Sequence, residues 1–141
     1  NSLKEEKNLY VYQPKIDISG KNTFLKIISN KGTIAYDKNL LRLENKTEIS
    51  GKTNNKNIIG KADKIDVDFN KRNLSSDELI LFIDEYEISL NEIILNDDEI
   101  IFKGNPLYLK DNEGIVTETP LVKLKSNGEL IFPSKLNIKN Y

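Results

Sequence analysis

Apolar and polar residues alternate in short runs along most of this chain. Ile65, Val67 and Phe69 are separated by single acidic residues, and Leu41 and Leu43 by one arginine. A period of two is typical of β-strands that bury one face. Clusters of Asn, Gly and Asp interrupt these runs at spacings near the ~8–12 residues typical of all-β meanders. The pattern therefore predicts an all-β protein built of many antiparallel strands.

The expected strands lie between those turn clusters. They cover residues 15–19, 24–29, 32–36, 40–44, 47–50, 58–69, 78–83, 87–95, 100–103, 107–110, 115–125, 129–132 and 136–139. Two places allow a second interpretation. The run 58–69 fits one long strand or two strands separated by a bend at Gly60, and the run 74–83 also fits a capped helical turn.

No segment has the periodicity of a helix that could cover the apolar face of such a sheet, so the sheet must fold over on itself. A sandwich, a jelly roll or a half-open barrel satisfies this requirement. At 141 residues and 16.2 kDa, the chain is expected to form a single domain over residues 1–141.

The composition narrows the classes of function. The 21 basic and 22 acidic residues nearly cancel, so bulk charge gives no attraction for nucleic acid. The chain has neither Cys nor His, which removes thiolate nucleophiles, the usual general base and the commonest zinc ligands. We therefore expect no enzyme, no cofactor and no metal site.

The segment DKIDVDFNKRN places Asp66, Asp68 and Asn70 two residues apart, as in the calcium-binding loop of an EF-hand. That loop also needs a glycine at its sixth position and a glutamate at its twelfth, where this chain has Lys71 and Asp77. No helical pattern precedes Asp66. We interpret the stretch as a strand with a solvated polar face.

Two further sequence patterns are too weak to indicate a phosphate-binding loop or a glycosidase active site. The sequence SGKT at 50–53 resembles the end of a phosphate-binding loop, but Lys46 occupies the place of the required first glycine, so a hairpin is favoured. Acidic pairs at positions 85/87 and 97/98 could act on a glycoside in principle. Both pairs lie in or beside expected turns, where solvated charge is ordinary.

A resemblance to a known family rests on the run PKIDISGKNTFLKIISNKGTIAYDKNLLRLENKTEISG, residues 14–51. It resembles the start of the LptC and LptA (OstA-like) lipopolysaccharide-transport domains. The matching features are Ile18-Ser19-Gly20, Tyr36-Asp37 and Leu41-Arg42-Leu43. A second copy of this pattern of strands and turns follows at residues 60–74. The segment IIFKGNPLYL, residues 100–109, resembles a later segment of the family. The N-terminal NLYVYQPKI is more similar to the anchored member LptC than to LptA.

This resemblance implies both a fold and a function. Members of the family form an antiparallel β-jelly roll folded over into an open V-shaped sandwich. The apolar interior shelters the acyl chains of lipopolysaccharide, and the edge strands join partner jelly rolls of the transport bridge. It implies a periplasmic location, and contact with an inner-membrane complex if an N-terminal anchor is present. We expect an anchor or a signal peptide to have been removed before residue 1.

The lipid groove expected from this interpretation is lined by alternating apolar residues of the central strands. These residues are Ile65, Val67, Phe69, Leu79, Leu81, Ile88, Leu90, Ile100, Phe102, Leu107 and Leu109. Each of them fits an ordinary closed core equally well. The inward parity is ambiguous at 79–83 and 93–95, where both faces are apolar. Lysines 15, 21, 26 and 31 are candidates for a basic rim near lipid phosphates.

A second function is compatible with the same residues. A closed β-sandwich could serve as an interaction or adhesion domain that binds protein or glycan through its edges or loops. This alternative predicts inner faces that interdigitate fully and leave no large continuous cavity.

Overall fold

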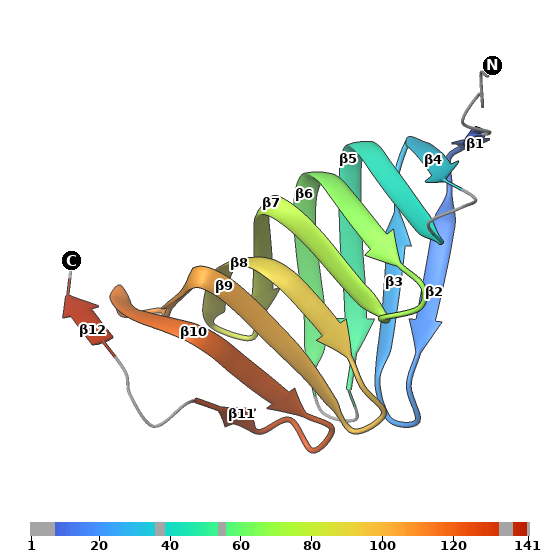
Figure 1. Cartoon of the computed structure of the whole chain (residues 1–141). Coiled ribbons are helices and arrows are strands. Elements are labelled where there is room, and N and C mark those ends of the chain that lie inside the picture. The colour runs from blue at the N-terminus through green and yellow to red at the C-terminus, as the bar shows by residue number, and fades with distance from the viewer. Residues whose placement is uncertain (1–7, 36–38, 54–55, 133–136, 141) are drawn as a thin grey trace.

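The computed structural model describes residues 8–35, 39–53, 56–132 and 137–140, and this part of the chain is entirely β-sheet and turn. None of these residues belongs to a helix, so none forms a helix long and apolar enough to cross a membrane. One antiparallel sheet contains all twelve strands. The sheet is folded over and stays open, which confirms the expected all-β jelly-roll or sandwich class (Figure 1).

The strand bounds are as follows. The strands are β1 (Asn8–Tyr12), β2 (Lys15–Ser19), β3 (Phe24–Ile28), β4 (Lys31–Ala35), β5 (Leu40–Lys52), β6 (Asn57–Asp68), β7 (Asn73–Ile83), β8 (Tyr86–Leu95), β9 (Glu99–Lys110), β10 (Ile115–Lys125), β11 (Leu130–Ile131) and β12 (Asn137–Asn140).

The long strands are bent near their middles, and the bends form a line that we call the crease. In β5 the crease falls at Asn45 and Lys46, which both have left-handed backbone (φ 63° and 59°). The strand pairs β5/β6, β7/β8, β8/β9 and β9/β10 each shift register there, as expected for β-bulges. In Figure 1 the crease runs along the top of the sheet and the hairpin turns lie below it.

The crease divides the sheet into two halves that face each other. The β1 half contains β1, β4, the 40–44 part of β5 and β11, whereas the β2 half contains β2, β3, the 48–52 part of β5 and β12. Strands β6 to β10 cross the crease and contribute to both halves. The two free edges of the sheet are formed by β1 with β2, and by β11 with β12.

The inward-facing residues change parity where the strands cross the crease. In β8, Ile88 and Leu90 are buried on one side of it, and Ile93 and Leu95 on the other. Strands β6, β7, β9 and β10 switch in the same way. Without the extra residues at the bulges, one half of each of these strands would present its polar side to the interior.

The expected strands agree with the structure except at a few boundaries. Segments 40–44 and 47–50 are two parts of β5, and segments 100–103 and 107–110 are two parts of β9, because the polar interruptions in both are bends within a continuous strand. The run 58–69 is a single strand without a break at Gly60, and the run 74–83 is strand rather than helix. Strand β1 was not expected. Tyr36 and Asp37, one of the features on which the family resemblance rests, lie outside the described residues.

Candidate ligand-binding interior

Ten of the eleven expected groove residues lie together in the interior between the two halves. Their side chains are 0–3% exposed. Phe69 is the exception: it follows the end of β6 in a turn, and 46% of its surface is exposed. The alternation of apolar and polar residues ends with β6, at the turn that contains Phe69. Extending the alternation to Phe69 therefore predicted an inward-facing side chain, whereas Phe69 is exposed.

The interior is lined by rows of apolar side chains that run across the strands. One row in the β1 half joins, by direct cross-strand pairing, Ile34, Leu41, Val67, Leu74, Ile93, Phe102 and Val122. A row in the β2 half joins Ile16, Ile27, Ile49, Gly60, Leu81, Ile88 and Leu109. The lining therefore extends over almost the whole width of the sheet.

The central part of the interior is filled by its own side chains. The described residues include twenty-two buried hydrophobic residues, none of them more than 3% exposed. Twelve were not among the expected groove residues. Seven of them, for example Leu25, Ile49 and Val122, lie in strands outside the expected groove, and five, for example Ile58 and Ile93, lie in the same central strands as the expected residues. In this state the two halves pack directly against each other.

The apolar lining becomes more accessible toward both free edges. Leu9 continues the row of Ile34 and Leu41 into β1 and is 45% exposed. At the other edge, Leu130 and Phe132 are only partly buried against the core. The apolar interior thus reaches the surface at each end of the sheet.

The polar groups buried in the described part of the chain are hydroxyls of Ser and Thr, and none is charged. Near the crease, the Thr47 hydroxyl contacts the Ser29 hydroxyl at 3.2 Å, and Ser29 Oγ donates to the Glu44 carbonyl oxygen at 2.5 Å. Thr119 Oγ1 donates to the Leu121 carbonyl oxygen at 3.2 Å. These groups satisfy each other or the backbone, which leaves the lining apolar in character.

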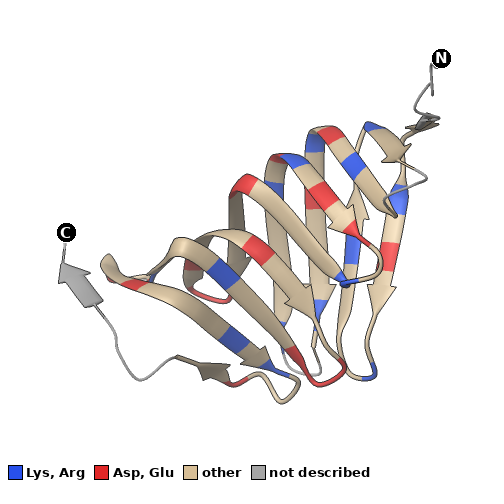
Figure 2. Cartoon of the chain, viewed as in Figure 1, with Lys and Arg blue, Asp and Glu red and all other residues tan. Residues whose placement is uncertain are grey.

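The charged residues lie on the outer face and at the turns, with both signs interspersed (Figure 2). Arg42 and Asp66 form a bidentate pair, with Nε and Nη2 at 2.8 and 3.0 Å from the two carboxylate oxygens. This hydrogen bond raises the pKa of Arg42. Lys125 Nζ lies 2.9 Å from Glu99 Oε1 and lowers the pKa of that carboxyl. An ion pair also joins Lys56 to Asp84.

The acidic stretch around Asp66 has structural partners. Asp66 is engaged by Arg42, and Asp68 Oδ1 accepts the backbone N–H groups of Asn70 and Lys71, both at 3.0 Å. The strand interpretation is confirmed by β6, which ends at Asp68. Asn70 belongs to the turn that follows. Ser50, Gly51 and Lys52 are likewise strand residues at the end of β5, where Gly51 packs close to Leu25.

Two hollows open on the outer face of the sheet. One of about 690 Å³ lies at the crease and is lined largely by charged residues, among them Lys46, Lys61 and Asp77. Another of about 500 Å³ is flanked by Ile59 and Phe82, which pair directly across β6 and β7.

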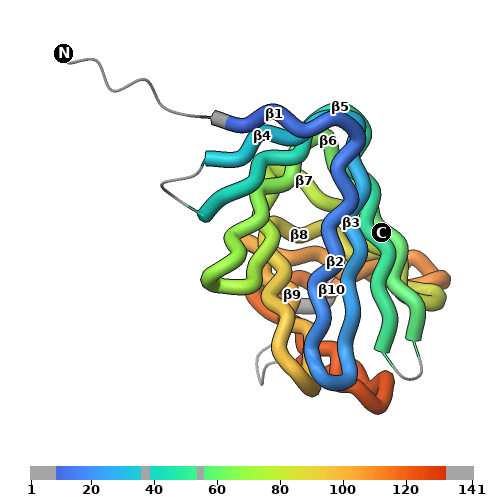
Figure 3. Tube along the Cα trace, turned by 90° about the vertical axis from the view of Figure 1, so that its right-hand side faces the viewer, coloured from blue at the N-terminus to red at the C-terminus, as the bar shows by residue number. Residues whose placement is uncertain are grey.

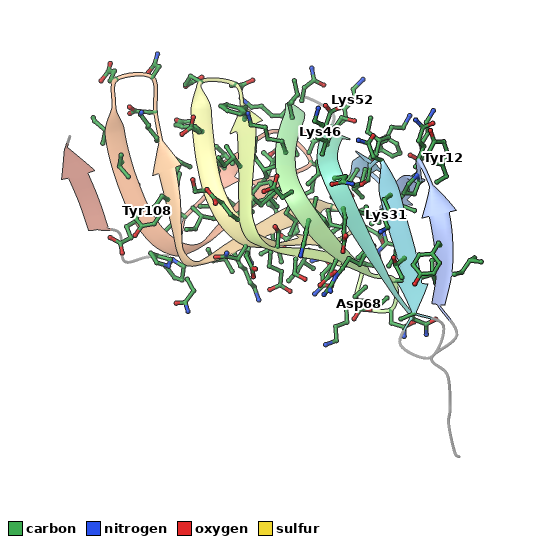
Figure 4. The ribbon with its side chains drawn as sticks, turned by 90° about the horizontal axis from the view of Figure 1, so that it is seen from above. Tyr12, Lys31, Lys46, Lys52, Asp68 and Tyr108 are labelled. Atoms are coloured by element: carbon green, nitrogen blue, oxygen red, sulfur yellow. The ribbon has the colours of Figure 1, made fainter. Side chains whose placement is uncertain are left out.

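The candidate rim lysines are exposed, and lysines 15, 26 and 31 occupy outward strand positions. Further exposed aromatic residues, Tyr12 and Tyr108, lie near opposite ends of the sheet (Figure 4).

Comparisons with known proteins add no relative to this picture. The chain matches no protein-family model and none of the curated proteins.

Proposed function

We propose that this protein is a lipid-sheltering component of a lipopolysaccharide-transport system, related to the LptC and LptA domains. The observation that carries the proposal is the apolar lining, which crosses the folded sheet in continuous rows and reaches the surface at both free edges. An uncharged interior open at its ends suits a chain-like apolar ligand. The fold class is the one that the resemblance implies.

The driving force for binding is the transfer of acyl chains out of water. Each methylene group contributes about 0.8 kcal/mol when it is buried in apolar surroundings. Because the central interior is filled by its own side chains, an acyl chain must separate the two halves of the sheet and replace their mutual contacts with its own. Because the lining is apolar and uncharged, the ligand that we propose is a lipid acyl chain, and the proposed cargo is lipopolysaccharide.

The free edges supply the means of assembly. Within the described ranges, one side of each edge strand has no ladder partner; these strands are β1 and β2 at one end of the sheet, and β11 and β12 at the other. Such edges can add a strand from another protein through backbone hydrogen bonds. In the proposed setting, the partners are other jelly rolls of a periplasmic bridge, including one at the inner membrane.

A closed interaction domain is the second candidate. It is favoured by the almost complete burial of the interior, since inner faces packed this tightly need no ligand to be stable. In that case the edges and loops would bind protein or glycan, and the interior would never accept a lipid.

Photocrosslinking from the interior separates the two candidates. We would replace Phe102 with benzoylphenylalanine, produce the protein in the envelope of cells that make lipopolysaccharide, irradiate and search for a lipopolysaccharide adduct. The matched control places the same residue at Phe82, which is 40% exposed on the outer face. At position 102 the added benzoyl group has to be accommodated inside a fully packed core, so circular dichroism must first show that this variant keeps its β-rich fold.

The carrier hypothesis predicts an adduct at position 102 and none at position 82. Native mass spectrometry of the unmodified protein should then retain a species of lipid A mass, and the same species should be lost in Phe102→Glu. An adduct-free position 102, together with a clean apo mass after lipopolysaccharide is added, would instead establish the closed interaction domain.

A further inference from the structure

We infer that the β2–β3 hairpin is a strap that ties the two halves of the sheet together and must release before the interior takes up a ligand. This inference rests on the proposed function, because it concerns how the same interior is reached. Its basis is a set of contacts between two turns that are more than seventy residues apart in sequence.

The turn of the hairpin, residues 20–23, belongs to the β2 half and binds the β8–β9 turn of the β1 half. Lys21 N donates to Asp97 Oδ1 at 3.1 Å, and Asn22 Nδ2 donates to Asp98 Oδ1 at 2.8 Å. Asn22 N also donates to the Asp97 carbonyl oxygen at 2.8 Å. In Figures 1 and 3, the tip of this hairpin reaches the turn below β9, on the side away from the crease.

Two neighbouring contacts complete the strap. Thr23 Oγ1 donates to the Asn96 carbonyl oxygen at 2.6 Å. Arg72, in the turn between β6 and β7, donates from its guanidinium to the Ser19 carbonyl oxygen at the end of β2. A side chain at Gly20 would not fit, because a Cβ there would lie 2.7 Å from the Asn96 carbonyl oxygen. The turn sequence is thus matched to a close approach.

The attachment of the hairpin to the rest of the sheet allows it to move as a unit. Strand β2 pairs with β3 alone, and β3 pairs with β5 over only five residues, whereas the β5–β6 ladder covers eleven residue pairs. At the crease, the hairpin continues into β1 through Gln13 and Pro14, where Gln13 has left-handed backbone (φ 48°). The hairpin is therefore held to the rest of the sheet by a short ladder and by the buried side chains of Leu25 and Ile27, and it has a bend at its base.

The strap contacts are also of a kind that can open and close. The Lys21 and Asn22 contacts are exposed hydrogen bonds, which water replaces at little net cost. The crease on the opposite side is covalently continuous and cannot separate. If the two halves part, they must part at the hairpin turns, and the strap is a polar connection that bridges them there.

A reversible crosslink tests the strap directly. The chain contains no cysteine, so Asn22→Cys combined with Asp98→Cys introduces the only two thiols. After oxidation, checked on a non-reducing gel, we would measure the rate at which the protein takes up cis-parinaric acid, a fatty acid that fluoresces in apolar surroundings, and purified lipopolysaccharide. The same sample is then measured again after reduction. We expect the oxidised form to load at least tenfold more slowly, and reduction to restore the rate.

A crosslink that does not span the halves serves as the matched control. Ser75→Cys with Glu92→Cys joins cross-strand partners of β7 and β8 within the β1 half, and its oxidation should leave the uptake rate unchanged. As an independent variant, Gly20→Ala should loosen the strap and accelerate uptake. An unchanged or slower rate in Gly20→Ala would count against the strap even if the disulfide pair failed to form.

The outcomes distinguish this inference from the function on which it rests. Slow loading only in the oxidised 22/98 variant supports the strap. Equal loading in its oxidised and reduced forms overturns the strap and leaves the carrier function in place. Failure of every protein, the unmodified chain included, to take up either probe overturns the carrier function and the strap with it.

Discussion

Apolar residues on the inner and outer faces of the same strands differ sharply in burial. In β7, Leu79 and Leu81 are fully buried, whereas their apolar neighbours Ile80 and Phe82 face outward, and Phe82 is 40% exposed. On β6, Ile58 is buried and Ile59 is 64% exposed. The side of the sheet on which a residue falls, rather than its hydrophobicity, therefore decides what it contributes to stability.

Truncation of one phenylalanine on each face should give the largest contrast. Phe102→Ala removes a fully buried ring and should lower the free energy of unfolding by about 3–5 kcal/mol, through lost burial and the cavity that remains. Phe82→Ala on the outer face should cost less than about 1 kcal/mol, since surface substitutions usually have small effects. Urea denaturation of both variants measures the difference. Similar losses would show that the outer face is also packed in solution.

Filling a small inward position should have an intermediate effect. Gly60 lies in the interior row, and a Cβ there would lie 2.2 Å from Leu81 Cδ2. Gly60→Ala is expected to lower the free energy of unfolding by about 1–3 kcal/mol, the usual range for overpacking. Ser50→Ala, on the outer face of the adjacent strand, should change it by no more than about 0.5 kcal/mol.

A double-mutant cycle sharpens this prediction. Leu81→Ala removes the atoms that the methyl group added by Gly60→Ala would meet, so the double variant should be more stable than the sum of the two single losses implies. Strict additivity in thermal or urea unfolding would contradict close packing between these two positions.

The smallest effect is expected from an outer-face ion pair and should depend on pH. The hydrogen bond from Lys125, helped by the charge of Lys123, lowers the pKa of Glu99 below its ordinary value of 4.5. A carboxyl with a lowered pKa stabilises the folded state fully above the unfolded value, and this contribution is lost as the pH falls through the folded value. Glu99→Gln should therefore flatten the decline in stability below about pH 4.5.

Unfolding in urea at several pH values between 3 and 7 (roughly the range over which carboxyls titrate) measures that slope. Glu113→Gln, an exposed acid in the β9–β10 turn, is the control. An equal change of slope in both variants would mean that Glu99 gains nothing specific from its lysine partners.

Much of the fold could be predicted because alternation and turn clusters mark most of the strands in the sequence. Ile88 and Leu90 are followed by Ile93 and Leu95, a change from even to odd positions without an intervening turn cluster. The same change between Phe102 and Leu107 suggested two strands, although the structure has one bent strand. Alternation thus identified many of the inward-facing residues and left the parity at 79–83 and 93–95 ambiguous. A bend and a chain reversal interrupt alternation in the same way, so the sequence did not distinguish them.

The features that could not be predicted depend on contacts between distant segments. Nothing local in Lys21 or Asn22 indicates that they meet Asp97 and Asp98, because hydrogen-bond partners of ordinary turn residues have no sequence periodicity. The exposure of Phe69 depends on where the β6–β7 turn begins. The bidentate partner of Arg42 follows from strand register, which the turns fix only after the sheet has formed.

The crease has a consequence for how such a molecule can change in size. Each creased strand makes its ladder bonds with its immediate neighbours only, and carries its own bend. Duplicating or deleting one antiparallel hairpin, such as β7–β8, would leave every other strand with an antiparallel neighbour and would lengthen or shorten each apolar row by two strands. The length of the apolar interior is therefore set by the number of hairpins, as in a repeat protein, and the fold can grow by internal duplication without a new core.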